Sequence, residues 1–203
     1  EAAKAELRAL VSRQFADGML PHIIYWVPGT LHRYDWGTPG TSALTQPPML
    51  AYAAWEIHKA SEDTDFLREL YPHLYRYYRY LIEQRDPRGH HLIGIINPDE
   101  SGEDNSPRFD DMLHVPVDIS LSDHLARRLE LVDANRTCHF DAAVCMKRHF
   151  WVKDVPFHAI LIENLRSLEH NAALLDDDTG QHFAKVNIDA IASAMRARLF
   201  DPS

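Results

Sequence analysis

Apolar residues recur at helical spacing along most of this chain, and this periodicity leaves little room for a β-sheet. The clearest apolar stripe follows Pro72 and consists of Leu74, Tyr77, Tyr78, Leu81 and Ile82. We expect Pro72 to begin that helix, because proline is favoured in a first helical turn, with at most a short helical turn over residues 66–71 before it. The sequence therefore predicts an all-α fold.

Similar stripes predict amphipathic helices in six other parts of the chain. These helices are expected in residues 1–15, 47–57, 121–132, 140–150, 156–172 and 188–199. Residues 176–180, rich in Asp and Gly, are predicted to form a turn. Residues 20–42 are rich in proline, glycine and aromatic residues without a sustained period, and a connection of that length is usually functional.

An acidic segment, Glu100 to Asp110, reads Glu-Ser-Gly-Glu-Asp-Asn-Ser-Pro-Arg-Phe-Asp and is too rich in turn formers to be regular structure. It follows an apolar run, residues 91–96, which can anchor it against the core. Partial burial or the neighbouring Glu103 would favour the protonated form of Asp104, as a general acid requires. From residue types alone, a solvated acidic turn is the alternative.

The acidic segment resembles the signature loop of glycoside hydrolase family 63 and of the bacterial mannosylglycerate and glucosylglycerate hydrolases, and trehalases carry a looser form of it. Two upstream segments also resemble parts of these enzymes, in the same order and at comparable spacing. They are residues 14–22, Gln-Phe-Ala-Asp-Gly-Met-Leu-Pro-His, and residues 45–48, Thr-Gln-Pro-Pro. Three matches in register favour the functional interpretation of the loop.

The resemblance implies an inverting glycosidase in which the residue matching Asp104 is the general acid and a second carboxylate activates water. That second residue, a glutamate in the family's C-terminal half, has no recognisable counterpart here, and the Trp-x-Trp-Asp motif that precedes the family's corresponding first helix is also absent. Neighbouring loop carboxylates should lie on the same side of the sugar as the acid, so none is a convincing base. These neighbours are Glu100, Glu103, Asp110 and Asp111.

The family's (α/α)6 toroid has about twice as many helices as the stripes predict here. We therefore expect residues 1–203 to be roughly half of an (α/α)6 toroid, as a partial catalytic domain truncated at both ends. Such a chain is predicted to be inactive, or nearly so, by itself.

Six residues are candidates for substrate binding: Gln46, Arg108, Trp36, Tyr34, Tyr25 and His22. The three aromatic residues can stack on a pyranose ring and offer polar tips to its hydroxyls, although packing within the loop would explain them equally well. The resemblance implies that Gln46 contacts sugar hydroxyls, and its alternative is to cap the following helix. His22 and Arg108 match motif positions but could equally brace the loops.

The leading function is hydrolysis of a small α-glucoside or α-mannoside of the glucosylglycerate or mannosylglycerate type. A trehalase or an oligosaccharide α-glucosidase is the close alternative. A non-catalytic helical carbohydrate-binding protein is the alternative from another class, because it would keep the aromatic loop without needing an acid. A helical repeat scaffold is disfavoured, since the chain shows no fixed repeat period.

The chain carries a net charge of −9 without a basic cluster, which argues against nucleic acid and anionic membranes as partners and leaves a small carbohydrate. It has no transmembrane run, and its start has no signal-peptide form, so a cytoplasmic location is expected. The chain is also expected to begin inside a domain. Its oligomeric state is not readable from sequence.

Carboxylate chemistry needs no cofactor or metal, and no tetrahedral zinc spacing recurs near the cysteines. Cys138 and Cys145, seven residues apart in an expected helical region, should be too far apart along the helix axis for a disulfide and are predicted to be reduced core thiols.

Overall fold

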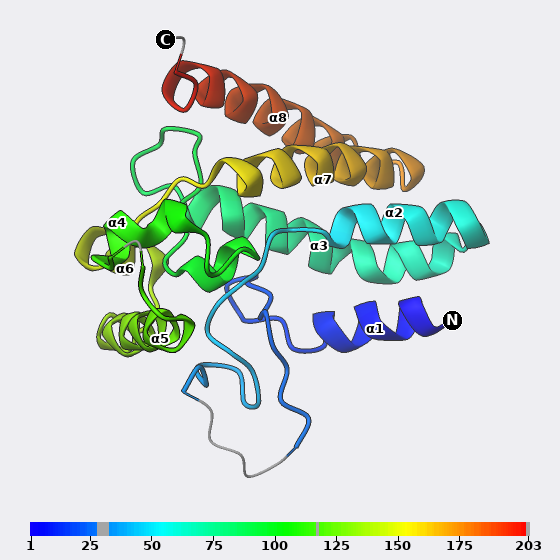
Figure 1. The fold of residues 1–203 in the computed structure, drawn as a ribbon. Helices are drawn as coiled ribbons and strands as arrows, with labels where there is room; N and C mark the ends of the chain where they lie inside the picture. The colour runs from blue at the N-terminus through cyan, green and yellow to red at the C-terminus, as the bar shows by residue number, and fades with distance from the viewer. Residues whose placement is uncertain (28–32, 117, 202–203) are drawn as a thin grey trace.

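The computed structural model describes residues 1–27, 33–116 and 118–201, and helices joined by irregular connections make up these residues (Figure 1). The helices are α1 (Ala2–Val11), α2 (Leu50–Ser61), α3 (Thr64–Gln84), α4 (Asp110–Leu113), α5 (Leu121–Thr137), α6 (Ala142–Arg148), α7 (Val155–Leu174) and α8 (Asp178–Arg198). Within the described ranges, β-pairing is limited to isolated bridges such as Ile95 with Val152. The prediction of an all-α fold is confirmed.

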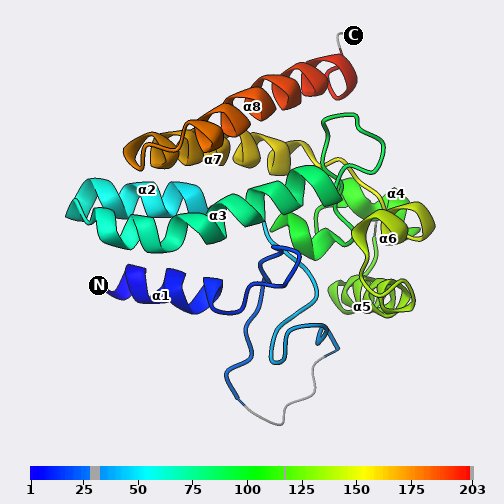
Figure 2. The same ribbon diagram turned by 180° about the vertical axis from the view of Figure 1, so that it is seen from behind.

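The long helices lie side by side and the short ones gather at one end of them (Figures 1 and 2). Helix α7 packs along both α8 and α2, while α3 packs against α2 and α7, and α1 against α2 and α3. Figure 2 shows α4, α5 and α6 grouped beyond the C-terminal end of α3. The acidic segment meets the long connection between α1 and α2 at this end of the molecule.

Helix α3 corrects one expectation, because it runs unbroken through Pro72 instead of beginning there. It begins after Asp63, whose side chain accepts a hydrogen bond from the Phe66 amide at 2.9 Å. Apolar side chains on both sides of the proline are buried, among them Phe66 and Leu74, and this packing offsets the backbone hydrogen bond that proline cannot make. Tyr77 and Tyr78, members of the predicted apolar stripe, are also buried and belong to the core.

The cysteine expectation is wrong, because Cys138 and Cys145 form a disulfide with their Cα atoms 5.7 Å apart. The region is not one helix: α5 ends at Thr137, and His139 and Phe140 both have positive φ before α6 begins. That tight turn brings the two cysteines within bonding distance. The disulfide is buried and ties the end of α5 to α6.

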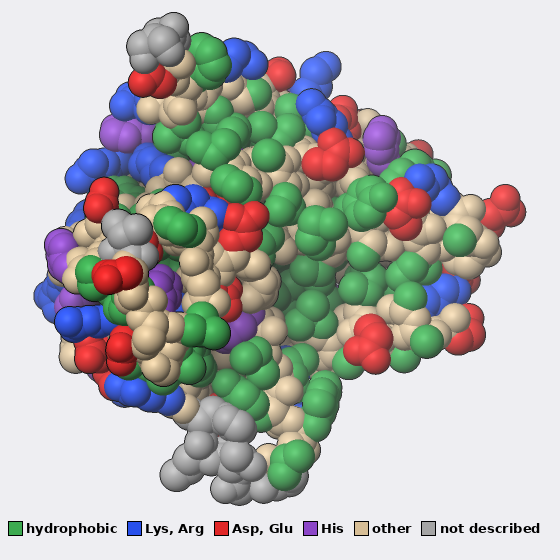
Figure 3. Space-filling model, in the orientation of Figure 1, with side chains coloured by type: hydrophobic (Ala, Val, Ile, Leu, Met, Phe, Trp, Pro, Cys, Tyr) green, Lys and Arg blue, Asp and Glu red, His purple; other side chains and the backbone are tan. Residues whose placement is uncertain are grey.

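The face shown in Figure 3 gathers hydrophobic side chains over α2 and α7. Large apolar residues of this helical layer are substantially exposed, including Tyr52 on α2 and Val155 and Leu174 on α7. None of the described helices is both long enough and apolar enough to cross a membrane.

Candidate active site

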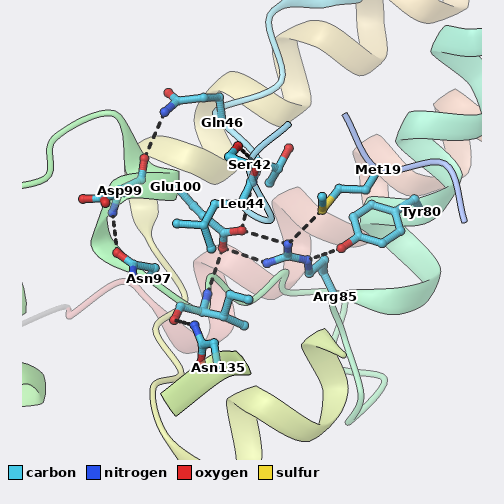
Figure 4. Close-up of polar contacts among 12 residues, drawn as sticks. Met19, Ser42, Leu44, Gln46, Tyr80, Arg85, Asn97, Asp99, Glu100 and Asn135 are labelled. Atoms are coloured by element: carbon cyan, nitrogen blue, oxygen red, sulfur yellow. Dashed lines mark hydrogen bonds and ion pairs between the residues drawn. The ribbon is translucent and has the colours of Figure 1, made fainter. Parts of the chain in front are cut away.

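The start of the acidic segment is fixed by a buried ion pair between Glu100 and Arg85, the C-cap residue of α3 (Figure 4). Both Glu100 oxygens accept hydrogen bonds from the guanidinium, at 2.7 and 2.8 Å, and the two side chains are at most 1% exposed. The same carboxylate accepts backbone hydrogen bonds from Thr45 at 3.1 Å and Ile96 at 2.9 Å. Glu100 therefore links three parts of the chain: the end of α3, the long connection before α2, and the apolar run of residues 91–96 that precedes the acidic segment.

Two asparagine side chains hold helix α5 against the apolar run and the start of the acidic segment. Asn135 donates a hydrogen bond to the Ile96 carbonyl at 3.0 Å, and Asn97 donates one to the Arg128 carbonyl at 3.2 Å. Asn97 also caps the short 3-10 helix η1 (Pro98–Ser101) by accepting from the Asp99 amide. These contacts place the inner face of α5 beside the acidic segment.

The far end of the segment is braced by Arg108, in the 3-10 helix η2 (Pro107–Phe109). Its Nε lies 2.7 Å from the buried carboxylate of Asp154, the residue that caps α7, and its guanidinium also contacts Glu103 and Ser106. The adjoining Phe109 is buried. The sequence left two interpretations of Arg108, substrate binding and bracing of the loop. Its contacts are those of a residue that braces the loop.

Asp104 lies between these two anchors with 42% of its side chain exposed. Its Oδ2 is 3.4 Å from a terminal nitrogen of Arg128 on α5, and the same nitrogen contacts Asp99. Tyr34, from the long connection, donates a hydrogen bond to the other Asp99 oxygen at 2.6 Å. These contacts link four side chains from three segments into one row, called the polar chain below. Its members are Tyr34, Asp99, Arg128 and Asp104, and it ends at Asp104.

His22 and Gln46 border this polar chain. The His22 ring lies edge-on to Tyr34, with centroids 5.6 Å apart, and its Nδ1 is 2.6 Å from the Ser42 hydroxyl. Burial lowers the pKa of His22, which keeps the imidazole neutral near pH 7. Gln46 donates a hydrogen bond from its side-chain amide to the Asp99 carbonyl at 3.0 Å (Figure 4).

The remaining two aromatic candidates occupy different surroundings. Burial raises the pKa of Tyr25 to about 12, so the phenol stays protonated, and its backbone amide bonds to the Gly40 carbonyl. Trp36 packs against Phe140 with ring centroids 5.3 Å apart. It lines a cavity of about 310 Å³ together with Phe15, Tyr80 and other residues, and within the described ranges this lining includes no residue of the acidic segment.

The sequence interpretation missed Asp99, Arg128, Glu100 and Arg85 as parts of the site. Glu100 had been treated only as one carboxylate of the acidic segment and Asp99 had not been considered as a site residue, whereas the structure pairs each with a buried arginine, Arg85 at the end of α3 and Arg128 on α5. Arg128 and Arg85 carried no local signal, because their partners lie 29 and 15 residues away in sequence.

This arrangement can present a partly exposed carboxyl group beside fixed hydrogen-bonding groups, which suits proton transfer. Within the parts of the chain that the structure describes, no group of three or more His, Cys, Asp or Glu side chains is placed to hold a metal ion.

Comparison with known proteins gives consistent matches. The whole chain, residues 1–203, matches the model of the mannosylglycerate hydrolase MGH1-like glycoside hydrolase domain. Mannosylglycerate hydrolase MGH1 of Selaginella moellendorffii is 36% identical over 66% of the chain and 30% of its own length, and the mannosylglycerate hydrolase of a Thermus thermophilus strain is 33% identical over 81% and 47%.

A crystal structure of the GH63 mannosylglycerate hydrolase from a second strain of Thermus thermophilus, in complex with Tris and D-glycerate, superposes with a TM-score of 0.86 at 31% identity. The superposition covers 98% of this chain and 54% of that protein. The chain thus spans about half, or less, of the length of the proteins it matches.

Proposed function

The chain belongs to the mannosylglycerate hydrolase MGH1-like glycoside hydrolase family, and from that premise and the geometry around Asp104 we propose that it carries the general acid of an inverting α-glycosidase. The observation that carries the proposal is the placement of Asp104, the only carboxylate of the segment that is both partly exposed and joined to the polar chain of Tyr34, Asp99 and Arg128. In this role Asp104 protonates the leaving glycosidic oxygen.

Three neighbouring carboxylates support the choice of Asp104, because each lies in closer contact with an arginine than Asp104 does. Glu100 is committed to Arg85, Asp99 to Arg128 and Glu103 to Arg108. An inverting mechanism also needs a base roughly 6.5–9.5 Å from the acid, across the sugar. We infer that this base is supplied from outside residues 1–203, which form part of the catalytic domain, and that the chain alone does not turn over substrate.

The proposed substrate is a small α-mannoside or α-glucoside with glycerate as its aglycone. Two observations support this class: the relatives described above are named mannosylglycerate hydrolases, and the solved relative was crystallised with D-glycerate. His22, Tyr34 and Gln46 border Asp104 through the polar chain and are the proposed contacts to the substrate. We assign Tyr25, Trp36 and Arg108 a supporting role, with Trp36 facing its own cavity.

The test is hydrolysis of mannosylglycerate, glucosylglycerate and trehalose by the complete protein and by residues 1–203, each with and without Asp104→Asn. The anomer released is read by proton NMR in the first seconds of reaction. We expect the complete protein to release the inverted anomer and Asp104→Asn to lower kcat by about 10²–10⁴-fold. The exposed carboxylate of Asp111 gives the control, because Asp111→Asn should leave kcat within about twofold.

Two results would contradict the proposal. Activity retained by Asp104→Asn would remove Asp104 as the acid, and turnover by residues 1–203 alone would place a base within them.

A further inference from the structure

Asp104 faces a buried cation at close range. Arg128 is 7% exposed in its side chain, and its terminal nitrogen lies 3.4 Å from the Asp104 carboxylate. An arginine stays protonated at every pH that an enzyme meets. A cation at this distance in general favours a negative charge beside it, whereas a general acid must carry its proton.

A second carboxylate compensates for this cation. Asp99 contacts the same Arg128 nitrogen, and its side chain is only 6% exposed, so the two charges form a buried pair. Three hydrogen bonds hold Asp99 in place: its side chain accepts from Tyr34, its amide donates to Asn97 and its carbonyl accepts from Gln46. Asp104 therefore faces a neutral pair instead of a lone cation.

The other titratable groups that face Asp104 do not restore a positive charge. His22 and Tyr34 approach from the long connection, and burial lowers the pKa of His22 and raises the pKa of Tyr34, so both side chains are neutral. Within the acidic segment itself, Glu100 is compensated by Arg85, and Glu103 by Arg108. The charge balance around Asp104 thus depends on Asp99 and Arg128.

We propose that Asp99 is a positioning residue for the acid: its carboxylate neutralises Arg128 and leaves Asp104 able to hold a proton, while Arg128 fixes where Asp104 and its neighbour Asn105 lie. Arg128 reaches Asn105 through its second terminal nitrogen, at 3.2 Å. Neither Asp99 nor Arg128 needs to touch the substrate. This inference deepens the proposed function and rests on Asp104 being the acid.

The test is the pH profile of kcat/KM for the complete protein, whose basic limb reports loss of the proton from the acid. Asp99→Asn leaves Arg128 unopposed, so the basic limb should move to lower pH by about one unit or more. Arg128→Met leaves Asp99 unopposed, so the limb should move the other way. In the double variant the basic limb should lie near its wild-type pH, and kcat should be lower because Asp104 is less well placed.

The matched control is Asp133→Asn, which removes an exposed carboxylate that lies on α5, as Arg128 does, and pairs with Arg33 of the long connection. It should leave the basic limb in place. A structural role alone would lower kcat equally at all pH values, so an unmoved limb in Asp99→Asn overturns the proposal. If Asp99→Asn does not fold, the test rests on Arg128→Met. A basic limb that stays at the wild-type pH or moves to lower pH in that variant overturns the proposal. Activity in Asp104→Asn would instead show that the proposed function itself has failed.

Discussion

Replacing Glu100 by glutamine should destabilise the protein more than any other single loss of charge in the acidic segment. Glu100 is fully buried and accepts four hydrogen bonds, two from Arg85 and one each from the Thr45 and Ile96 amides. Each carboxylate oxygen takes one guanidinium bond and one backbone bond. Whichever oxygen becomes the amide nitrogen of glutamine, one arginine N–H and one backbone N–H then face a donor.

The magnitude follows from those two lost acceptor contacts and the unpaired charge. A buried donor without an acceptor costs about 1–3 kcal/mol, and breaking a buried ion pair from one side costs about 3–5 kcal/mol. The two figures describe overlapping losses, so we expect the free energy of unfolding to fall by about 3–5 kcal/mol. Domains are stable by only about 5–15 kcal/mol, so the loss should be plain in a urea titration followed by circular dichroism.

Two further variants separate burial from charge. Glu83→Gln removes an equally short but exposed pair with Arg79 and should cost less than about 0.5 kcal/mol. Adding Arg85→Met to Glu100→Gln removes the unpaired charge. The double variant should therefore lose about 2 kcal/mol less free energy of unfolding than the two single variants lose in sum. A Glu100→Gln variant no less stable than Glu83→Gln would refute the reasoning.

Two other predictions concern the disulfide and the start of α8. Replacing both Cys138 and Cys145 by serine should lower the free energy of unfolding by about 2–3 kcal/mol, as loop closure over a separation of 7 residues implies, and thiol titration of the denatured protein should find two thiols only after reduction. The hydrogen bond from Tyr71 lowers the pKa of Asp177 below its usual 3.8, so its stabilisation is complete above that value and lost as the pH falls through the lower folded-state pKa. The melting temperature should therefore depend less on pH below about 4 in Asp177→Asn than in wild type; equal slopes would contradict the assignment.

Periodicity was enough to predict where the helices lie, and in α3 and α7 the apolar stripe that the sequence displays is buried. In α5 part of it is not: Leu121 and Leu125 are exposed, and the buried face also carries His124, Arg128 and Asn135. All seven expected helices are present, and the structure adds the short α4. The errors arose where tertiary packing overrides local rules. Pro72 is accommodated inside α3 by the buried side chains around it, and the tight turn at His139 and Phe140 allows a disulfide that a continuous helix would forbid.

The acidic segment was recognisable from its residue types and its family resemblance, but the division of labour among its carboxylates was not. Asp99, Glu100 and Asp104 are chemically similar, and nothing in their order reveals which will be buried. That choice is made by Arg85 and Arg128, which arrive from helices formed elsewhere in the chain. Predicting it requires knowing how α3 and α5 pack, which is information that no local pattern contains.

The two arginine pairs also explain why an irregular loop can hold an acid in a fixed position. Precise placement needs side chains whose own positions are locked by packing and hydrogen bonds, and a solvated loop lacks these. Here the loop is fixed at its start by Glu100 on Arg85 and at its end by Arg108 on Asp154, so it is attached to the C-cap of α3 and to the N-cap of α7. Only the stretch between these anchors is left partly exposed, and Asp104 lies within it. Variants at the Arg108 anchor should therefore lower kcat more than they raise KM. They displace the acid, whereas the groups proposed to bind the sugar contact Tyr34 and Asp99 and stay in place.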